Sequence, residues 1–155
     1  MLTEPRLTHV ALPSSDLERS IDFYKRLTPL VVVDRHEDDM GQAVWLSNDK
    51  QVKDPFVLVL VMFYADREKG QQPILTPFAH IGIEVPNRKD VEDIAEMGRE
   101  MSCLHWEPRQ MPDPVGYICA LKDPDGNVVE FSHNQKVFET IRNLWESEDA
   151  AALET

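Results

Sequence analysis

The stretch KDPDGNVVEFSH, residues 122–133, decides the predicted fold because it joins a tight turn to a strand. In the turn DPDG, residues 123–126, the proline presets φ, the second aspartate tolerates a bend and the glycine accepts a positive φ. Side chains of the following strand alternate between two faces, so Glu130 is expected to point away from the more apolar face. An unpaired carboxylate in mid-strand is costly, which makes a metal ion or another cation its expected partner.

Composition narrows the possible partners and the compartment. With 155 residues, 42% of them hydrophobic, the chain suffices for one well-packed domain or two small ones. The formal net charge of -12 argues against nucleic acid, whose binding needs clustered Lys and Arg. The longest apolar run, residues 56–65, is about half a membrane span, so no membrane partner is expected. Two cysteines without metal-type spacing, and a charged N-terminus, indicate a cytoplasmic protein.

One pattern of predicted elements occurs twice. Strands of the first copy, residues 5–65, are expected over residues 7–12, 30–34, 42–46 and 56–64. Strands of the second copy, residues 77–134, are expected over residues 78–85, 104–107, 116–122 and 127–133. In each copy a helix is predicted after the first strand, and the polar stretch 66–77 is predicted to be a linker. The chain therefore carries a duplicated β-α-β-β-β unit of about 70 residues.

The helix boundaries come from capping and proline signals. Ser15-x-x-Glu18 has the form of a capping box, and the helix that it begins ends before Pro29. The second helix starts near Arg88. An amphipathic helix and a tail are expected over residues 136–155, outside the domain formed by residues 1–135. This last helix either packs on the outside of the domain or forms a dimer contact.

Two histidines and one glutamate are candidate metal ligands. His9 and His80 occupy matching places in the first strands of the two copies, and both are expected to share an orientation with Glu130. Two imidazoles and a carboxylate suit Fe(II), Mn(II), Ni(II) or Zn(II) and leave positions for water or substrate. The alternative is a pair of hydrogen-bonded core histidines with an unrelated glutamate. Their recurrence at equivalent strand positions favours the metal site.

Four segments resemble landmarks of the vicinal oxygen chelate superfamily, which includes glyoxalase I, extradiol dioxygenases, fosfomycin-resistance enzymes and bleomycin-resistance proteins. They are THVAL at 8–12, DLERSIDFY at 16–24, AHIG at 79–82 and DPDGNVVEF at 123–131. The resemblance implies an α+β fold of two tandem βαβββ modules that form an eight-stranded, cup-shaped, open barrel. It also implies metal-ligand roles for His9, His80 and Glu130, and a homodimer.

Departures from the family pattern leave the reaction open. Glyoxalase I takes a fourth ligand from the last strand of its first module, where this chain has FVLVLVMF at 56–63. The extradiol signature has a tyrosine where Ala120 stands and a histidine near residues 111–113. Fosfomycin enzymes need a cationic cluster, for which Arg109 and Lys122 are the candidates here. No catalytic base is assigned.

Two functions of different classes are compatible with these residues. The first is a divalent-metal enzyme that chelates a small oxygen-rich substrate through two neighbouring oxygens, as a lyase or isomerase or as a dioxygenase. The second is a metal-free protein that sequesters a small molecule, as bleomycin-resistance proteins do. Further side chains that could line the cup, without an assigned catalytic role, are Gln42, Trp45, His105, Trp106 and Tyr117.

Overall fold

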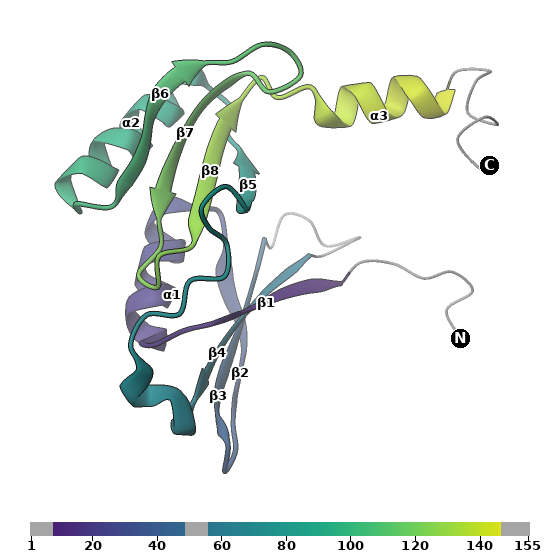
Figure 1. Cartoon of the computed structure of the whole chain (residues 1–155). Helices are drawn as coiled ribbons and strands as arrows, with labels where there is room; N and C mark the ends of the chain where they lie inside the picture. The colour runs from purple at the N-terminus through teal and green to yellow at the C-terminus, as the bar shows by residue number, and fades with distance from the viewer. Residues whose placement is uncertain (1–7, 49–55, 147–155) are drawn as a thin grey trace. The chain divides into compact units, whose positions relative to one another are not determined.

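The computed structural model describes residues 8–48 and 56–146 and contains the duplicated order of elements (Figure 1). The first module consists of β1 (His9–Pro13), α1 (Leu17–Leu27), β2 (Val31–Glu37), β3 (Gly41–Ser47) and β4 (Val57–Phe63). The second module consists of β5 (His80–Glu84), α2 (Arg88–Glu100), β6 (Leu104–Gln110), β7 (Tyr117–Lys122) and β8 (Val128–His133). Between the modules lies the 3-10 helix η1 (Tyr64–Lys69), and α3 (Val137–Glu146) follows β8.

Each module forms its own four-stranded sheet. Sheet 1 has the order β1-β4-β3-β2, and sheet 2 has the same order, β5-β8-β7-β6. The first strand of sheet 1 runs parallel to β4, with His9 opposite Val57, while β3 pairs antiparallel with both β2 and β4. The predicted α+β fold of two βαβββ modules is therefore confirmed.

The chain divides into two compact units that do not coincide with the modules. Unit 1 extends to His80 and includes Lys122–Val128; unit 2 comprises Ile81–Leu121 and the chain from Val129 onward. The turn between β7 and β8 consequently belongs to unit 1, although most of both strands belongs to unit 2.

In unit 1 the core lies between α1 and one face of sheet 1. The apolar stripe of α1 buries Leu17, Ile21 and Leu27, and the facing strands bury alternate residues such as Leu58 and Leu60. The predicted capping box at Ser15 is wrong by one residue. Asp16 is the N-cap, and its side chain accepts a hydrogen bond from the Arg19 amide at 3.1 Å.

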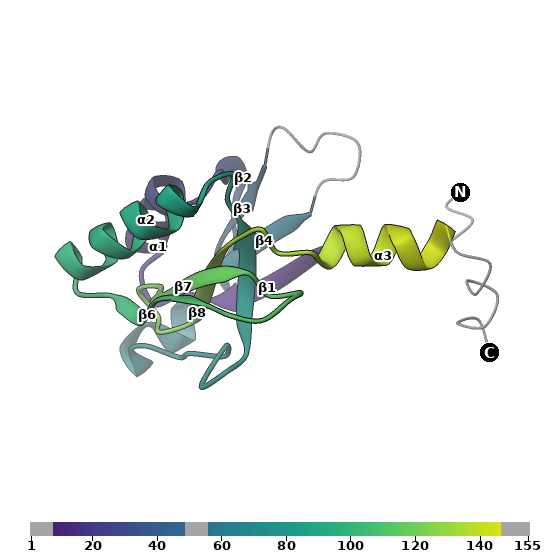
Figure 2. The same cartoon turned by 90° about the horizontal axis from the view of Figure 1, so that it is seen from above.

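In unit 2 the helix α2 covers one face of sheet 2, as both views show (Figure 2). The Cys119 thiol donates to the Val91 carbonyl at 3.5 Å, and Gly98 lies against the side chain of Leu121. At the start of α2, the Asn87 backbone amide donates to the Asp90 carboxylate at 2.9 Å as part of a capping box, which was not predicted from the sequence.

Several boundaries differ from the predicted ones. Strand β2 continues to Glu37, so His36 lies in an exposed strand position and not in a loop. The stretch expected as a linker begins with η1. Helix α3 extends away from sheet 2, and its first two residues, Val137 and Phe138, are exposed. Within residues 8–48 and 56–146, no helix combines the length and apolarity needed to cross a membrane.

Candidate functional site

His9 lies on the face of sheet 1 opposite α1. Along β1, Leu12 is buried at 2% exposure on the α1 side, whereas His9 and Ala11 are exposed on the other side. The His9 Nδ1 atom lies 2.9 Å from the Thr8 hydroxyl oxygen, which can donate or accept there. His9 therefore has the predicted orientation away from the helix-covered core.

His80 begins β5 and has one ring nitrogen committed. Its Nδ1 lies 2.7 Å from the Phe78 carbonyl oxygen, and because a carbonyl can only accept, Nδ1 carries the proton. The other ring nitrogen, Nε2, then carries the lone pair that a metal ion requires. A backbone carbonyl that fixes the tautomer in this way is a common companion of metal-binding histidines.

Glu130 occupies the middle of β8, a central strand of sheet 2, and is only 5% exposed. Its Oε1 atom accepts a hydrogen bond from the Gln135 side-chain amide at 3.3 Å. At the turn, the Asp123 backbone amide donates to the Asn127 carbonyl, which pairs these two residues across the hairpin of β7 and β8. Three residues further along each antiparallel strand, Ala120 of β7 lies opposite Glu130. The carboxylate consequently has a small neighbour on one side.

The residue beside Glu130 on the neighbouring strand β5 is identified by a backbone hydrogen bond that occurs in both modules. The Ser14 amide donates to the Val61 carbonyl at 2.8 Å, and the Val85 amide donates to the Ser132 carbonyl at 2.7 Å. Because these two bonds are equivalent, β5 pairs with β8 in the same parallel register as β1 with β4. This register places Gly82 opposite Glu130. No atom lies within 4 Å of the position that a Cβ on Gly82 would take. Space is therefore available beside the carboxylate, and His80 precedes Gly82 by two residues on the same face of β5.

The donor set fits a divalent metal by its chemistry. A histidine whose lone pair is on Nε2, a second histidine outside the core and a buried carboxylate are ligands of the type that borderline transition metals prefer. His9 and His80 belong to unit 1 and Glu130 to unit 2. Within the described part of the chain, no three His, Cys, Asp or Glu side chains are grouped closely enough to hold a metal ion. The three metal-ligand assignments stay a prediction.

The aromatic candidates separate onto two faces of sheet 2. Trp106 is opposite Ala120 in the β6–β7 register and so shares the face of Glu130, with the His105 ring stacked beside it at 5.5 Å. Tyr117 lies on the other face, because its hydroxyl donates to Glu92 of α2 at 3.4 Å and the Arg88 guanidinium lies over its ring. Tyr117 is therefore a packing residue beneath α2.

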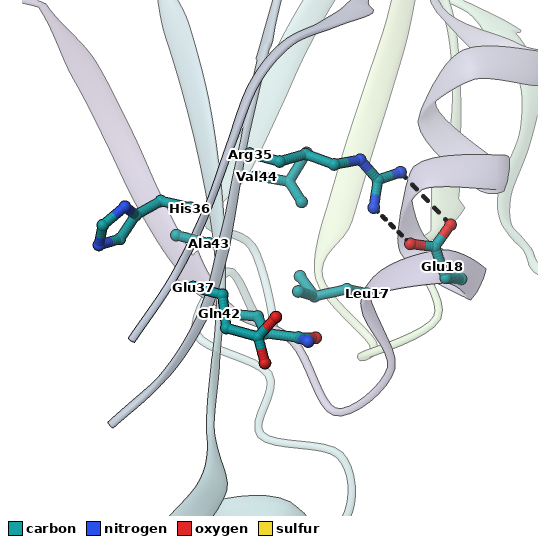
Figure 3. A pocket seen from close by; sticks show the side chains of 8 residues that line it. All are labelled: Leu17, Glu18, Arg35, His36, Glu37, Gln42, Ala43 and Val44. Atoms are coloured by element: carbon teal, nitrogen blue, oxygen red, sulfur yellow. Dashed lines mark hydrogen bonds and ion pairs between the residues drawn. The ribbon is translucent and has the colours of Figure 1, made fainter. Parts of the chain in front are cut away.

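In unit 1 the two other candidates have different surroundings. Trp45 is 45% exposed and lies opposite Val59, on the face of sheet 1 away from α1. Gln42 lies opposite the buried Met62 and lines a cavity of about 320 Å³ between α1 and strands β2 and β3 (Figure 3). The charged side chains there are largely satisfied: Arg35 pairs with Glu18, and Glu37 accepts a hydrogen bond from Tyr64. This cavity is a shallow polar surface feature.

The DPDGN turn forms a buried polar cluster with α1 inside unit 1. Asp125 accepts from the amide and hydroxyl of Ser15 at 2.8 and 2.6 Å, and Asp123 accepts from the Tyr24 hydroxyl at 2.8 Å. Burial raises the pKa of Asp123, while hydrogen bonds from Asn127 and Tyr24 act in the opposite direction. The sequence revealed the turn but not this role, because nothing local indicates that its aspartates bond to residues about 100 positions earlier.

The two thiols are poor nucleophiles. Burial raises the pKa of Cys119 to about 12, and burial also raises the pKa of Cys103. Cys119 lies beneath α2 and Cys103 is half-buried, as small apolar residues often are.

Comparison with known proteins gives consistent results. The family model of the Glyoxalase/Bleomycin resistance protein/Dioxygenase superfamily matches residues 6–131. An uncharacterized protein of Pseudomonas aeruginosa, PA2024, is 37% identical over 134 residues, which covers 84% of this chain and 90% of the relative.

Solved structures share the fold at low sequence identity. The trypanothione-dependent glyoxalase I of Leishmania major matches with a TM-score of 0.71 at 20% identity, over 95% of this chain and 99% of that one. The fosfomycin resistance protein FosX of Listeria monocytogenes matches with a TM-score of 0.62 at 12% identity, over 90% and 98%. The antibiotic binding protein TnmS3 of a Streptomyces species matches with a TM-score of 0.60 at 20% identity, over 86% and 98%. These likenesses confirm the predicted fold.

Proposed function

The chain belongs to the Glyoxalase/Bleomycin resistance protein/Dioxygenase superfamily, and we propose that it is a divalent-metal enzyme acting on a small oxygen-rich molecule. The observation that carries the proposal is the hydrogen bond from His80 Nδ1 to the Phe78 carbonyl oxygen at 2.7 Å, because this tautomer places the lone pair of the imidazole on Nε2, as in many metal-binding histidines. The buried carboxylate of Glu130, with open space beside it at Gly82, supports the same interpretation.

His9, His80 and Glu130 would hold the metal through two imidazole nitrogens and a carboxylate oxygen. A divalent metal bound there would supply a Lewis acid with positions left for two neighbouring substrate oxygens. The Thr8 hydroxyl and the Phe78 carbonyl would keep the two imidazoles in orientation, and the Gln135 amide would do the same for Glu130. A structural relative, a mutant of Listeria FosX, was solved with Mn(II) and 1S,2S-dihydroxypropylphosphonic acid.

The expected reaction type depends on which metal is bound. With nickel, zinc or manganese we expect lyase or isomerase chemistry, and with Fe(II) we expect a dioxygenase. Val59 stands in the last strand of the first module on the His9 side, so that strand adds no fourth ligand from this position. Three protein ligands therefore remain, which leaves more open positions than a four-ligand site.

A second candidate function is small-molecule sequestration without a metal. It is favoured by the apolar face of sheet 1 opposite α1, where Val57, Val59 and Trp45 lie near His9 in the strand register. The fold neighbour TnmS3 is itself described as an antibiotic binding protein.

Metal content distinguishes the two functions. The protein is purified anaerobically and analysed for metals, together with His9→Ala, Glu130→Ala and the control Glu84→Ala. Glu84 is an exposed carboxylate on the same face of β5 as Gly82. We expect near-stoichiometric metal in the wild type and in Glu84→Ala, and loss in the other two. A wild type that contains no metal and takes up none on reconstitution would leave the sequestration function.

The proposal includes a homodimer in a cytoplasmic setting. Helix α3 extends from unit 2 with Val137 and Phe138 exposed at its start, which is compatible with a contact to a second copy. Elution at the monomer volume at both high and low protein concentration would contradict the dimer.

A further inference from the structure

The segment that leads into β5 is bonded to the end of the DPDGN turn, and both belong to unit 1. The side-chain carbonyl oxygen of Asn127 accepts hydrogen bonds from the Ile74 backbone amide at 2.9 Å and from the Leu75 backbone amide at 3.0 Å. The Val128 amide donates to the Leu75 carbonyl at 2.9 Å. These four residues form a linker clamp, which fixes the stretch between the modules to the turn.

Asn127 is the rigid part of the linker clamp. It is 0% exposed, and its backbone amide and side-chain nitrogen both donate to the Asp123 carboxylate, at 2.8 and 3.1 Å. Asp123 is held in turn by the Tyr24 hydroxyl of α1 at 2.8 Å. Because both ends of the buried Asn127 side chain are bonded, the network gives it one orientation. The linker is therefore anchored to the turn and, through the turn, to α1.

In the first module the corresponding backbone amide makes a different bond. The Val57 amide donates to the carbonyl of Thr8, the residue directly before the first strand, at 3.0 Å. The equivalent acceptor for Val128 would be Ala79, directly before β5, but its amide donates to Leu75, four residues earlier. The residues between Leu75 and β5 are all exposed. They form a short loop that the first module does not have at this position.

This loop ends at the carbonyl that fixes the tautomer of His80. Only Thr76 and Pro77 separate the linker clamp from Phe78, whose carbonyl oxygen accepts from His80 Nδ1 at 2.7 Å. The Phe78 ring also lies edge-on to the imidazole, with 5.4 Å between the ring centroids. The Pro77 ring locks its own φ, and the Thr76 amide donates to the Ile74 carbonyl at 3.2 Å. Two restrained residues thus connect the clamp to the partner of His80.

We propose that Asn127 is a positioning residue for His80. By clamping the linker, it holds the Phe78 carbonyl where it keeps the proton on Nδ1 and orients the imidazole. The inference rests on the proposed function, which assigns the Nε2 lone pair to the metal. Asn127 itself touches neither metal nor substrate. His9 needs no such clamp, because its Nδ1 partner is the side chain of the preceding residue.

The test lengthens the linker on either side of the clamp. The inner insertion places one extra glycine between Leu75 and Thr76, and the outer insertion, its matched control, places one between Gly70 and Gln71. Both fall at the surface of the same linker, where added length is tolerated. Only the inner insertion lengthens the connection from the clamp to the partner of His80.

The first readout is the His80 tautomer, which needs no metal. Nitrogen-15 NMR of the metal-free protein at about pH 8, where an imidazole is neutral, distinguishes Nδ1–H from Nε2–H. The His80 signals are identified by their loss in His80→Gln. We expect Nδ1–H in the wild type and in the outer insertion. In the inner insertion we expect mainly Nε2–H, the commoner tautomer of a free imidazole.

The second readout is the affinity for Zn(II), measured by titration calorimetry. We expect the inner insertion to lower it about tenfold, the lower end of the loss for a partner that orients a ligand, and the outer insertion to leave it unchanged. Asn127→Ala should produce the same two changes as the inner insertion. Asn127→Asp keeps an acceptor for the Ile74 and Leu75 amides but loses the donor to Asp123. It should lower the urea midpoint while preserving the tautomer and the Zn(II) affinity.

The outcomes separate this inference from the proposed function. If the wild type binds Zn(II), an inner insertion that leaves the tautomer or the affinity unchanged overturns the positioning role alone, as do equal changes in the two insertion variants. If the wild type binds no Zn(II), a tautomer change confined to the inner insertion leaves the positioning of His80 standing, and the metalloenzyme proposal fails. A tautomer change in neither variant overturns the inference with or without metal.

Discussion

The two modules have the same backbone plan but differ at the centre of the face opposite their helices. His9 and His80 are 71 positions apart, and the carbonyls of Val61 and Ser132, which receive equivalent bonds, have the same separation. By this correspondence, Val59 of β4 matches Glu130 of β8. The first strand of each module thus begins with a histidine, whereas only the last strand of the second module has a carboxylate at its centre.

The residues around this central position differ accordingly. Val59 has Ala11 and the large Trp45 as its strand neighbours, whereas Glu130 has Gly82 and Ala120. The first module therefore presents an apolar wall, and the second presents an acid group between two small residues. We infer that duplication supplied the scaffold twice, and that the chemistry diverged through a few side chains on one face.

The largest effect is expected from making the second module resemble the first. Glu130→Val places an aliphatic side chain at the centre of β8, as in β4, and removes the only carboxylate of the predicted ligand set. We expect the affinity for Zn(II) to fall at least about 100-fold, since even the loss of a supporting residue costs 10–100-fold. Calorimetric titration measures this, with Glu84→Gln as the control that removes a carboxylate from β5.

Unchanged Zn(II) affinity in folded Glu130→Val would show that the centre of β8 is no more a metal site than the centre of β4. The near-equivalence of the modules would then extend to function, and sequestration would become the favoured activity.

Two glycines provide the next comparison, through stability. A Cβ on Gly41 at the start of β3 would overlap the Met62 carbonyl oxygen and lie 3.1 Å from the Phe63 Cα, whereas a Cβ on Gly82 would meet nothing within 4 Å. We expect Gly41→Ala to lower the free energy of unfolding by about 2–3 kcal/mol, because the β4 backbone must move. Gly82→Ala should change it by less than about 1 kcal/mol.

Urea unfolding of the two variants under the same conditions measures the difference. Similar losses in both would mean that the close backbone approach in sheet 1 has a counterpart above Gly82, and that the space beside Glu130 is filled.

The sequence was sufficient for the fold but not for the polar contacts that hold its parts together. Alternating strands, two helices and the DPDGN turn predicted both modules, because their local patterns repeat at fixed spacing. Strand ends were less predictable: β2 and β6 each extend three residues beyond the expected end, where polar side chains hide the strand pattern. The capping residue of α1 was missed because Ser15 and Asp16 both resemble caps, and Ser15 bonds to Asp125 instead.

The candidate site was predictable only as a set of residue types on strand faces. The alternation of side chains along a strand predicted that His9 points away from the core and that Glu130 and Phe131 lie on opposite faces. Neither prediction depends on distant contacts. The alternation did not reveal that Tyr117 faces α2, because aromatic residues suit either face of a buried strand. Nor did it reveal the proximity of Arg109 and Trp106, which depends on β-bulges in β6.

The smallest effect concerns one tyrosine hydroxyl in each unit. The buried Tyr24 hydroxyl donates to Asp123 at 2.8 Å within unit 1, whereas the Tyr117 hydroxyl reaches Glu92 at 3.4 Å within unit 2. We expect Tyr24→Phe to lower the free energy of unfolding by about 1–2 kcal/mol at neutral pH, because a buried carboxylate loses a donor. Tyr117→Phe should cost less than about 0.5 kcal/mol, since its bond is long and partly exposed.

The pH dependence tests the cause. Burial raises the pKa of Asp123 in the folded protein, so the stabilisation from its protonation is present below the ordinary carboxyl pKa and is lost as the pH rises through the folded value. The Tyr24 hydroxyl opposes this loss by stabilising the carboxylate, and burial raises the pKa of Tyr24, so the hydroxyl stays a donor. The cost of Tyr24→Phe should therefore be smaller at acidic pH, where Asp123 is protonated, and larger above its folded pKa. Urea unfolding between about pH 4 and pH 8 measures it; a cost independent of pH would mean that the hydroxyl contributes through packing and not through the charge of Asp123.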